Sequence, residues 1–261
     1  MSPLGIVIIV VILVLVFALL KYMVSNPYTI QGSVVNGKTR TEIDSESLAT
    51  DGTNTPPVNF TYSVWFYVNN WNYRYGHHKI IFARMGAKSA PNAGAIDGIN
   101  GLFPCPAVIL GAVENNVSIS LGCHPNPETM ASSGGSNGTQ SSQNSIIHTC
   151  NVPNVPLQRW VNLIMSVYQR TLDVYLDGKL VRTCLLPGIA DVRPKANIQV
   201  TPMGGFDGWT SKLEYWPNSF NPQQAWNTYI QGYKTSVFGM DYQVQVSVLE
   251  NGSEQSSYTI G

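Results

Sequence analysis

The chain has 261 residues, and its 15 basic and 15 acidic side chains give a formal net charge of zero. Charged residues make up only 11% of the chain, against about 25% in an average soluble protein. Without a basic excess the chain lacks the electrostatic footprint of a nucleic-acid-binding protein. A surface this poor in charge suits contact with sugars or burial against neighbours in an assembly, although a compositional habit of the source would produce the same bias.

The first expected element is a membrane anchor. From Leu4 to Leu20 the chain carries no charged, hydroxyl or amide side chain. A helix rises about 1.5 Å per residue, so a helix over 4–24 spans roughly 31 Å, about one hydrocarbon thickness. A cleaved signal peptide is the alternative, but no basic residue precedes the run and no A-x-A site follows it. We expect a transmembrane helix over 1–24, with the lipid bilayer as a partner and a single-pass membrane location.

Strand periodicity dominates the rest of the chain. Residues 25–58 are polar and rich in turn residues, which predicts a stalk or a first hairpin. From residue 59 the apolar side chains recur with period two, which is typical of β-strands. One face of the first strand is expected to carry Phe60, Tyr62, Val64, Phe66 and Val68, and the other face Thr61, Ser63, Trp65, Tyr67 and Asn69. A second inward face is expected from Val161, Leu163, Met165 and Val167.

Turn signals between the expected strands complete the fold prediction. Asp177-Gly178 is the residue pair of a two-residue hairpin turn, and Asn115-Asn116 predicts another hairpin. Many short strands with such turns predict a mainly β fold, an antiparallel β-sandwich. Residues 125–145 are rich in Gly and Ser and predict a flexible surface loop, and a C-terminal strand and tail are expected over 234–261.

The four cysteines are disulfide candidates. Cys105, Cys123, Cys150 and Cys184 allow three pairings, which the sequence does not distinguish. Cys123-His124 and His148-x-Cys150 flank the Gly/Ser-rich loop and could also be considered as zinc ligands. Neighbouring residues rarely both reach one metal ion, so we predict a disulfide near this loop and no metal site.

Two matches to catalytic motifs lack the surroundings that their chemistry needs. Residues 32–39 fit the phosphate-binding pattern G-x-x-x-x-G-K-T, but no apolar helix follows them. A hairpin turn at Asn36-Gly37 is expected there instead. Residues 42–46 fit the E-x-D-x-E core of glucanases, but no Trp or Phe lies nearby to stack a sugar. We expect a solvated linker at this point and no enzymatic activity.

Three pieces of the chain resemble concanavalin A-like sandwiches of the laminin-G type (LamG-like). The pieces are Phe60–Val68, Arg159–Leu163 with Leu172–Val181, and Gly205–Trp209 with Leu213–Trp216, followed by a helix start at Asn221-Pro222. The resemblance extends over 60–233 and implies a jelly-roll sandwich over 59–261. This fold hosts lectins, adhesins, hydrolases and spacers, so it does not fix the function. Some family members bind calcium, and calcium stays open here because no matching ligand set can be placed.

The anchor ahead of an Asn-rich, charge-poor domain also resembles membrane-anchored virion proteins of large DNA viruses. This resemblance implies a minor capsid or virion membrane protein that links a bilayer to other capsid proteins. The alternative is a surface carbohydrate-binding protein, lectin-like or adhesin-like, with glycans as partners. Its predicted ligand-binding residues lie on and after the first strand: Trp65, Tyr67, Trp71, Tyr73, Arg74 and Tyr75. Aromatic rings can stack on sugars, although packing against a neighbouring strand or subunit is an alternative role for them.

Overall fold

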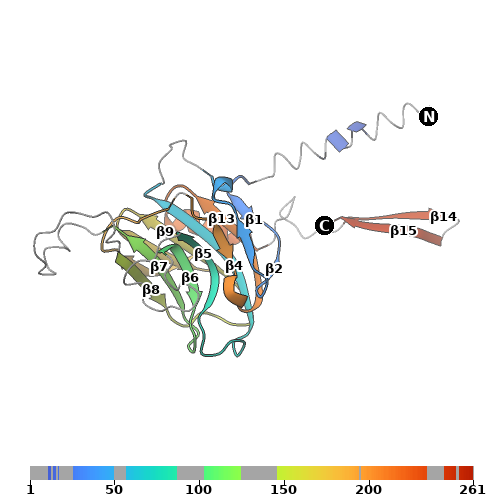
Figure 1. Cartoon of the computed structure of the whole chain (residues 1–261). Helices are drawn as coiled ribbons and strands as arrows, with labels where there is room; N and C mark the ends of the chain where they lie inside the picture. Colours follow the sequence, from blue (N-terminus) through green and yellow to red (C-terminus); the bar gives the residue numbers. More distant parts are fainter. Residues whose placement is uncertain are drawn as a thin grey trace, which may run out of the picture. The chain divides into compact units, whose positions relative to one another are not determined.

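Two antiparallel sheets pack face to face over Pro27–Lys234 (Figure 1). The computed structural model describes residues 26–49, 57–86, 103–124, 146–193, 195–233, 244–250 and 253–260, with positions 11, 12, 14, 15 and 17. The seven-stranded sheet has the order β1 (Thr29–Gln31), β13 (Asp207–Trp216), β4 (Phe60–Asn70), β9 (Trp160–Tyr168), β10 (Thr171–Leu176) and β11 (Lys179–Leu185), and β2 (Val35–Asn36) also pairs with β13. The six-stranded sheet has the order β3 (Thr41–Ile43), β12 (Ile198–Val200), β5 (Lys79–Gly86), β6 (Phe103–Leu110), β7 (Val117–Cys123) and β8 (Ile146–Val152). The predicted antiparallel β-sandwich is therefore confirmed.

The core lies between the two sheets and uses the predicted inward faces. The five inward residues of β4 and the four of β9 are all buried in one apolar cluster. The opposite sheet contributes Phe82, Val108, Leu110, Ile119 and Leu121 to the same cluster. Each fully buried side chain of this size stabilises the fold by roughly 1.5–3 kcal/mol relative to an exposed one. The predicted β10–β11 hairpin also forms, with positive φ at Asp177 and Gly178 as its turn requires.

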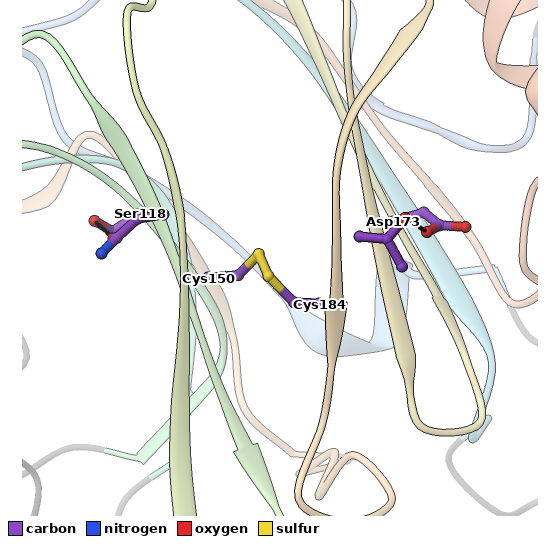
Figure 2. The surroundings of a disulfide bond; sticks show 6 residues. Ser118, Cys150, Asp173 and Cys184 are labelled. Atoms are coloured by element: carbon purple, nitrogen blue, oxygen red, sulfur yellow. Dashed lines mark hydrogen bonds between the residues drawn. A yellow bond between two sulfur atoms is a disulfide. The ribbon is translucent and has the colours of Figure 1, made fainter.

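One disulfide joins the edges of the two sheets. Cys150 on edge strand β8 is bonded to Cys184 on edge strand β11, with their Cα atoms 6.2 Å apart. Figure 2 shows Ser118 and Asp173 on the outer sides of the strand pairs that the disulfide connects. There Ser118 donates to Asn151, and Thr183 donates to Asp173. The disulfide therefore links the two sheets covalently at the edges formed by β8 and β11.

The other two cysteines are free thiols in the interior. Cys105 and Cys123 are both buried, and burial raises the pKa of the Cys123 thiol to about 12. A zinc site from the Cys123 and Cys150 pairs does not form, because the sulfur of Cys150 is in the disulfide. Within the described ranges no group of three or more His, Cys, Asp and Glu residues could hold a metal ion.

The N-terminal polar segment contributes strands to both sheets. β1 and β2 pair with β13, and β3 pairs with β12, so the sandwich begins before the predicted boundary at residue 59. The expected turn at Asn36-Gly37 forms, with a bond from the Thr39 amide to the Asn36 carbonyl, but it is not a hairpin turn, because β2 pairs with β13 and β3 pairs with β12. The E-x-D-x-E match does not form a single strand face. Glu42 lies on β3, whereas Asp44 caps the short 3-10 helix η1 (Ser45–Ser47).

Several predictions fall at or beyond the limits of the described residues. Only positions 11, 12, 14, 15 and 17 of the predicted anchor are described, and they are helical and exposed. No helix within the described part of the chain is long and apolar enough to cross a membrane. The predicted loop at 125–145 lies outside the described residues. The expected C-terminal strand is β14 (Val244–Glu250), which pairs with β15 (Ser253–Ile260) as a two-stranded sheet of its own.

Replacing both Cys150 and Cys184 by serine should lower the free energy of unfolding by about 3–4 kcal/mol. The bond closes a loop with a sequence separation of 34 residues, and its loss restores that freedom to the unfolded chain. Urea denaturation without reductant measures the change. Dithiothreitol should lower the free energy of unfolding of the native chain by the same amount. It should not change the free energy of unfolding of the double variant. Equal destabilisation of both proteins by the reductant would contradict the prediction.

Candidate functional site

Three aromatic side chains form a row across the outer face of the seven-stranded sheet. The strand register pairs Trp209 of β13 with Tyr67 of β4, and Tyr67 with Trp160 of β9. The ring centroids of Trp209 and Tyr67 are 5.5 Å apart, and those of Tyr67 and Trp160 are 5.9 Å apart. Both contacts are edge-to-face, a favourable geometry for aromatic pairs. We refer to Trp209, Tyr67 and Trp160 as the aromatic row.

The aromatic row is fixed in place yet reaches solvent. Trp209 is 38% exposed, and Tyr67 and Trp160 are partly exposed. Tyr233, which follows helix α3 (Pro222–Ile230), stacks on Trp160 with centroids 4.4 Å apart and planes 12° apart. Rings held this firmly lose little conformational entropy when a ligand binds.

Gly208 allows β13 to approach β4 next to the aromatic row. A Cβ atom at this position would lie only 1.8 Å from the carbonyl oxygen of Tyr67. The register shifts between Asp207 and Gly208, which marks a β-bulge. The glycine and the bulge therefore bring Trp209 directly opposite Tyr67.

Helix α3 covers the other part of the outer face. Asn221 caps the helix in a capping box with Gln224, and Pro222 occupies the first turn, as the sequence predicts. Trp65 points outward as predicted but is only 6% exposed, because it lies beneath Tyr229 and Tyr233 with its ring stacked on Tyr229 at 5.6 Å. The placement of Trp65 corrects its expected role as a ligand-binding residue, because the covering helix leaves little of the ring for a ligand.

Polar side chains lie beside the aromatic row, next to Tyr67 and Trp209 along their strands. The Asn69 side-chain amide donates to the Asp207 carboxylate at 3.4 Å, and the Lys38 ammonium lies 2.8 Å from the other oxygen of Asp207. Asn69 is two residues beyond Tyr67 on β4, and Asp207 is two residues before Trp209 on β13. An amide, a carboxylate and an ammonium group therefore adjoin the exposed rings.

The remaining predicted residues lie in the loop between β4 and β5. Trp71 packs against the core, and its indole N–H donates to the Val113 carbonyl at 2.8 Å, so its contacts are mainly internal. The Tyr73 hydroxyl donates to the Gly204 carbonyl at 3.1 Å. Tyr75 is 57% exposed. Of the six predicted residues, the structure brings Tyr67 into the aromatic row and Tyr73 and Arg74 into a second group near Lys38 and Gly204.

Sequence reasoning missed two members of the row, Trp160 and Trp209, and their neighbour Tyr233. Trp160 directly precedes the inward residue Val161, so alternation alone could have placed it on the outer face. For Trp209 the alternation is broken, because the register of β13 shifts again between Ser211 and Glu214. No local signal brings Trp160 and Trp209 to either side of Tyr67.

Comparison with known proteins identifies the fold only. No protein-family model and no curated protein matches the chain. The binding domain of botulinum neurotoxin serotype D aligns with a TM-score of 0.52 and 9% identity, over 79% of this chain and 50% of that one. A structure of the receptor binding domain of botulinum neurotoxin D aligns with a TM-score of 0.50 and 8% identity, over 77% and 51%. The chain thus spans about half the length of either structure.

Alanine substitution should separate the covered tryptophan from the exposed one. Trp65→Ala should lower the free energy of unfolding by about 3–5 kcal/mol, because it leaves a cavity beneath α3. Trp209→Ala should cost much less, because that ring already reaches solvent. Chemical denaturation of the two variants measures the difference. Equal losses would mean that Trp209 is as structural as Trp65.

Proposed function

We propose that the chain is a carbohydrate-binding module that recognises a glycan receptor with the aromatic row. The observation that carries this proposal is the alignment of Trp209, Tyr67 and Trp160 on three adjacent strands, partly exposed and held by edge-to-face contacts. Partly exposed aromatic rings side by side are unusual unless they contact a partner. A sheet face supplies a firmer base for such a contact than a loop does.

The chemistry of the row suits a sugar ring. A pyranose presents C–H groups on its faces, which pack on aromatic rings, and hydroxyl groups at its edge. Asn69 and Asp207 beside the row provide an amide and a carboxylate that can donate to and accept from such hydroxyls. Apolar rings with a few polar groups at their border are the usual composition of a small-ligand site.

The solved structures support a receptor-binding role by analogy. Both neurotoxin domains are binding domains, one of them described as receptor binding. Their likeness to this chain lies in the sandwich fold, so the glycan specificity proposed here rests on the aromatic row. The disulfide between Cys150 and Cys184 adds support for presentation in an oxidising compartment, as at a cell or virion surface.

The membrane anchor, its bilayer partner and the virion location remain proposals that rest on the sequence, as does the role of linking a bilayer to a capsid shell.

Alanine at Trp209 or Trp160 should weaken glycan binding by the full chain at least tenfold, because each substitution removes a stacking surface. A glycan array should identify ligands, and calorimetry should then measure their affinities. Trp226→Ala is the matched control: Trp226 is 41% exposed on α3 but is not in the row. The control variant should bind like the native chain. Absence of any glycan ligand, or equal losses in all three variants, would overturn the proposed function.

A further inference from the structure

The second group of residues, around Tyr73 and Arg74, holds two cationic side chains, Arg74 and Lys38, of which Lys38 has a carboxylate partner. We refer to Lys38, Tyr73, Arg74 and Gly204 as the Arg74 corner. Its members touch: the Lys38 ammonium lies 4.7 Å from the centre of the Tyr73 ring, and a Cβ on Gly204 would lie 3.5 Å from the Tyr73 hydroxyl and 3.8 Å from Nη1 of Arg74. Within the described ranges, Lys38 is the one member that forms an ion pair, with Asp207. The Arg74 guanidinium has no carboxylate partner there.

The guanidinium of Arg74 is held in a fixed orientation. Its Nη1 donates to the main-chain carbonyls of Met203 and Gly205. These two bonds involve only Nη1. The N–H groups of Nε and Nη2 remain available, and they form the edge of the guanidinium that can donate two parallel hydrogen bonds to an acidic group. Arg74 and Met203 both adopt left-handed backbone conformations, with φ of 53° and 57°. Such conformations are unfavourable for non-glycine residues and are often found where a ligand is held.

A third basic side chain, Lys79, lies near the Arg74 corner. Lys79 is only 1% exposed, and its ammonium lies 4.4 Å from the centre of the Trp71 ring. Within the described part of the chain this ammonium has no hydrogen-bond partner. Burial, and then the nearby charge of Arg74, lower the pKa of Lys79. Among the described residues, Arg74 and Lys79 therefore lack a carboxylate partner, whereas Lys38 is paired with Asp207.

Lys38 and Asp207 connect the corner to the aromatic row. Lys38 contacts the Tyr73 ring on one side and Asp207 on the other. Asp207 in turn accepts from Asn69, next to Tyr67. A single oligosaccharide could therefore cover both places. The carboxylate of Asp207 would repel an acidic group placed beside the row, so such a group fits better next to Arg74.

We propose that the Arg74 corner binds an acidic group, a carboxylate or a sulfate, on the same glycan that stacks on the aromatic row. This inference rests on the proposed glycan-binding function and narrows its ligand to acidic glycans. Arg74 is the residue that contacts the acidic group, and Lys38 adds a second positive charge. The row supplies most of the contact area, and the corner distinguishes acidic from neutral sugars.

The test compares matched glycans on the full chain. The probes are an oligosaccharide with a terminal carboxylate sugar, the same oligosaccharide without that sugar, and a sulfated form. Calorimetry at low salt should show that the native chain binds the acidic forms at least about tenfold more tightly than the neutral one. The preference should shrink as salt is added, because the contact is electrostatic. The tighter of the two acidic forms identifies the acidic group.

Substitutions at Arg74 then assign the preference to this residue. Arg74→Gln should reduce the affinity for the acidic glycan to about that for the neutral one. Arg74→Lys should keep part of the preference, because it keeps the charge but loses the two-pronged geometry. Arg182→Gln, on exposed edge strand β11, makes the same charge change elsewhere and should keep the whole preference.

Each outcome separates the inference from the proposed function. Equal binding of acidic and neutral glycans by the native chain would overturn the inference and leave the function standing. Absence of any glycan binding would overturn both. In a third outcome, Arg74→Gln loses affinity for the acidic and the neutral glycan alike, and Arg74→Lys binds both glycans like the native chain. This result would mean that Arg74 only holds the loop in place, and it would overturn the inference.

Discussion

The register between β13, β4 and β9 is the constraint on which the rest of the structure depends. Successive residues of a strand point to opposite faces, so one alignment decides both faces together. The alignment that buries Phe66 between the sheets also places Tyr67 outside, between Trp209 and Trp160. A slip of one residue would expose the apolar core residues of β4. The core therefore stabilises the aromatic row, although the row contributes little to the core.

Helix α3 and the segment after it decide which part of the outer face remains available to a partner. The inner face of β4 is covered along its length, and on the outer face Thr61, Ser63 and Trp65 are buried as well, with Trp65 beneath Tyr229. Lys212 on β13 holds the C-terminal end of the helix in place, because its buried ammonium donates hydrogen bonds to the Gln231 side chain and to the carbonyl of Gly232. Two residues further along β4, Tyr67 lies beyond this cover. The same strand thus supplies a structural aromatic residue and an accessible one.

The features that depend on local sequence pattern were predicted correctly from the sequence. Alternation identified the inward faces of β4 and β9, the Asp177-Gly178 pair identified a hairpin, and Asn221-Pro222 identified the start of α3. Sequence reasoning did not reach the features that depend on contacts between distant segments. The pairing of Cys150 with Cys184 requires two sheet edges to meet, and the burial of Trp65 requires a helix more than 150 residues away in sequence. The short strands of 29–43 have too few residues to show a period, so their place in the sandwich became visible only through their partners β12 and β13.

The two parts of the proposed site differ in the forces that they use, and this difference bears on how recognition would work. Contacts on the aromatic row depend on apolar area and shape, which salt hardly affects. Contacts at the Arg74 corner depend on charge, which is screened at the surface but acts over a longer distance. Strand pairing holds the row rigidly, whereas the corner is held by hydrogen bonds from loop side chains to main-chain carbonyls. A loop can change by substitution without disturbing the register of the sheet. The selectivity for acidic sugars could therefore change in related chains while the stacking surface stays the same.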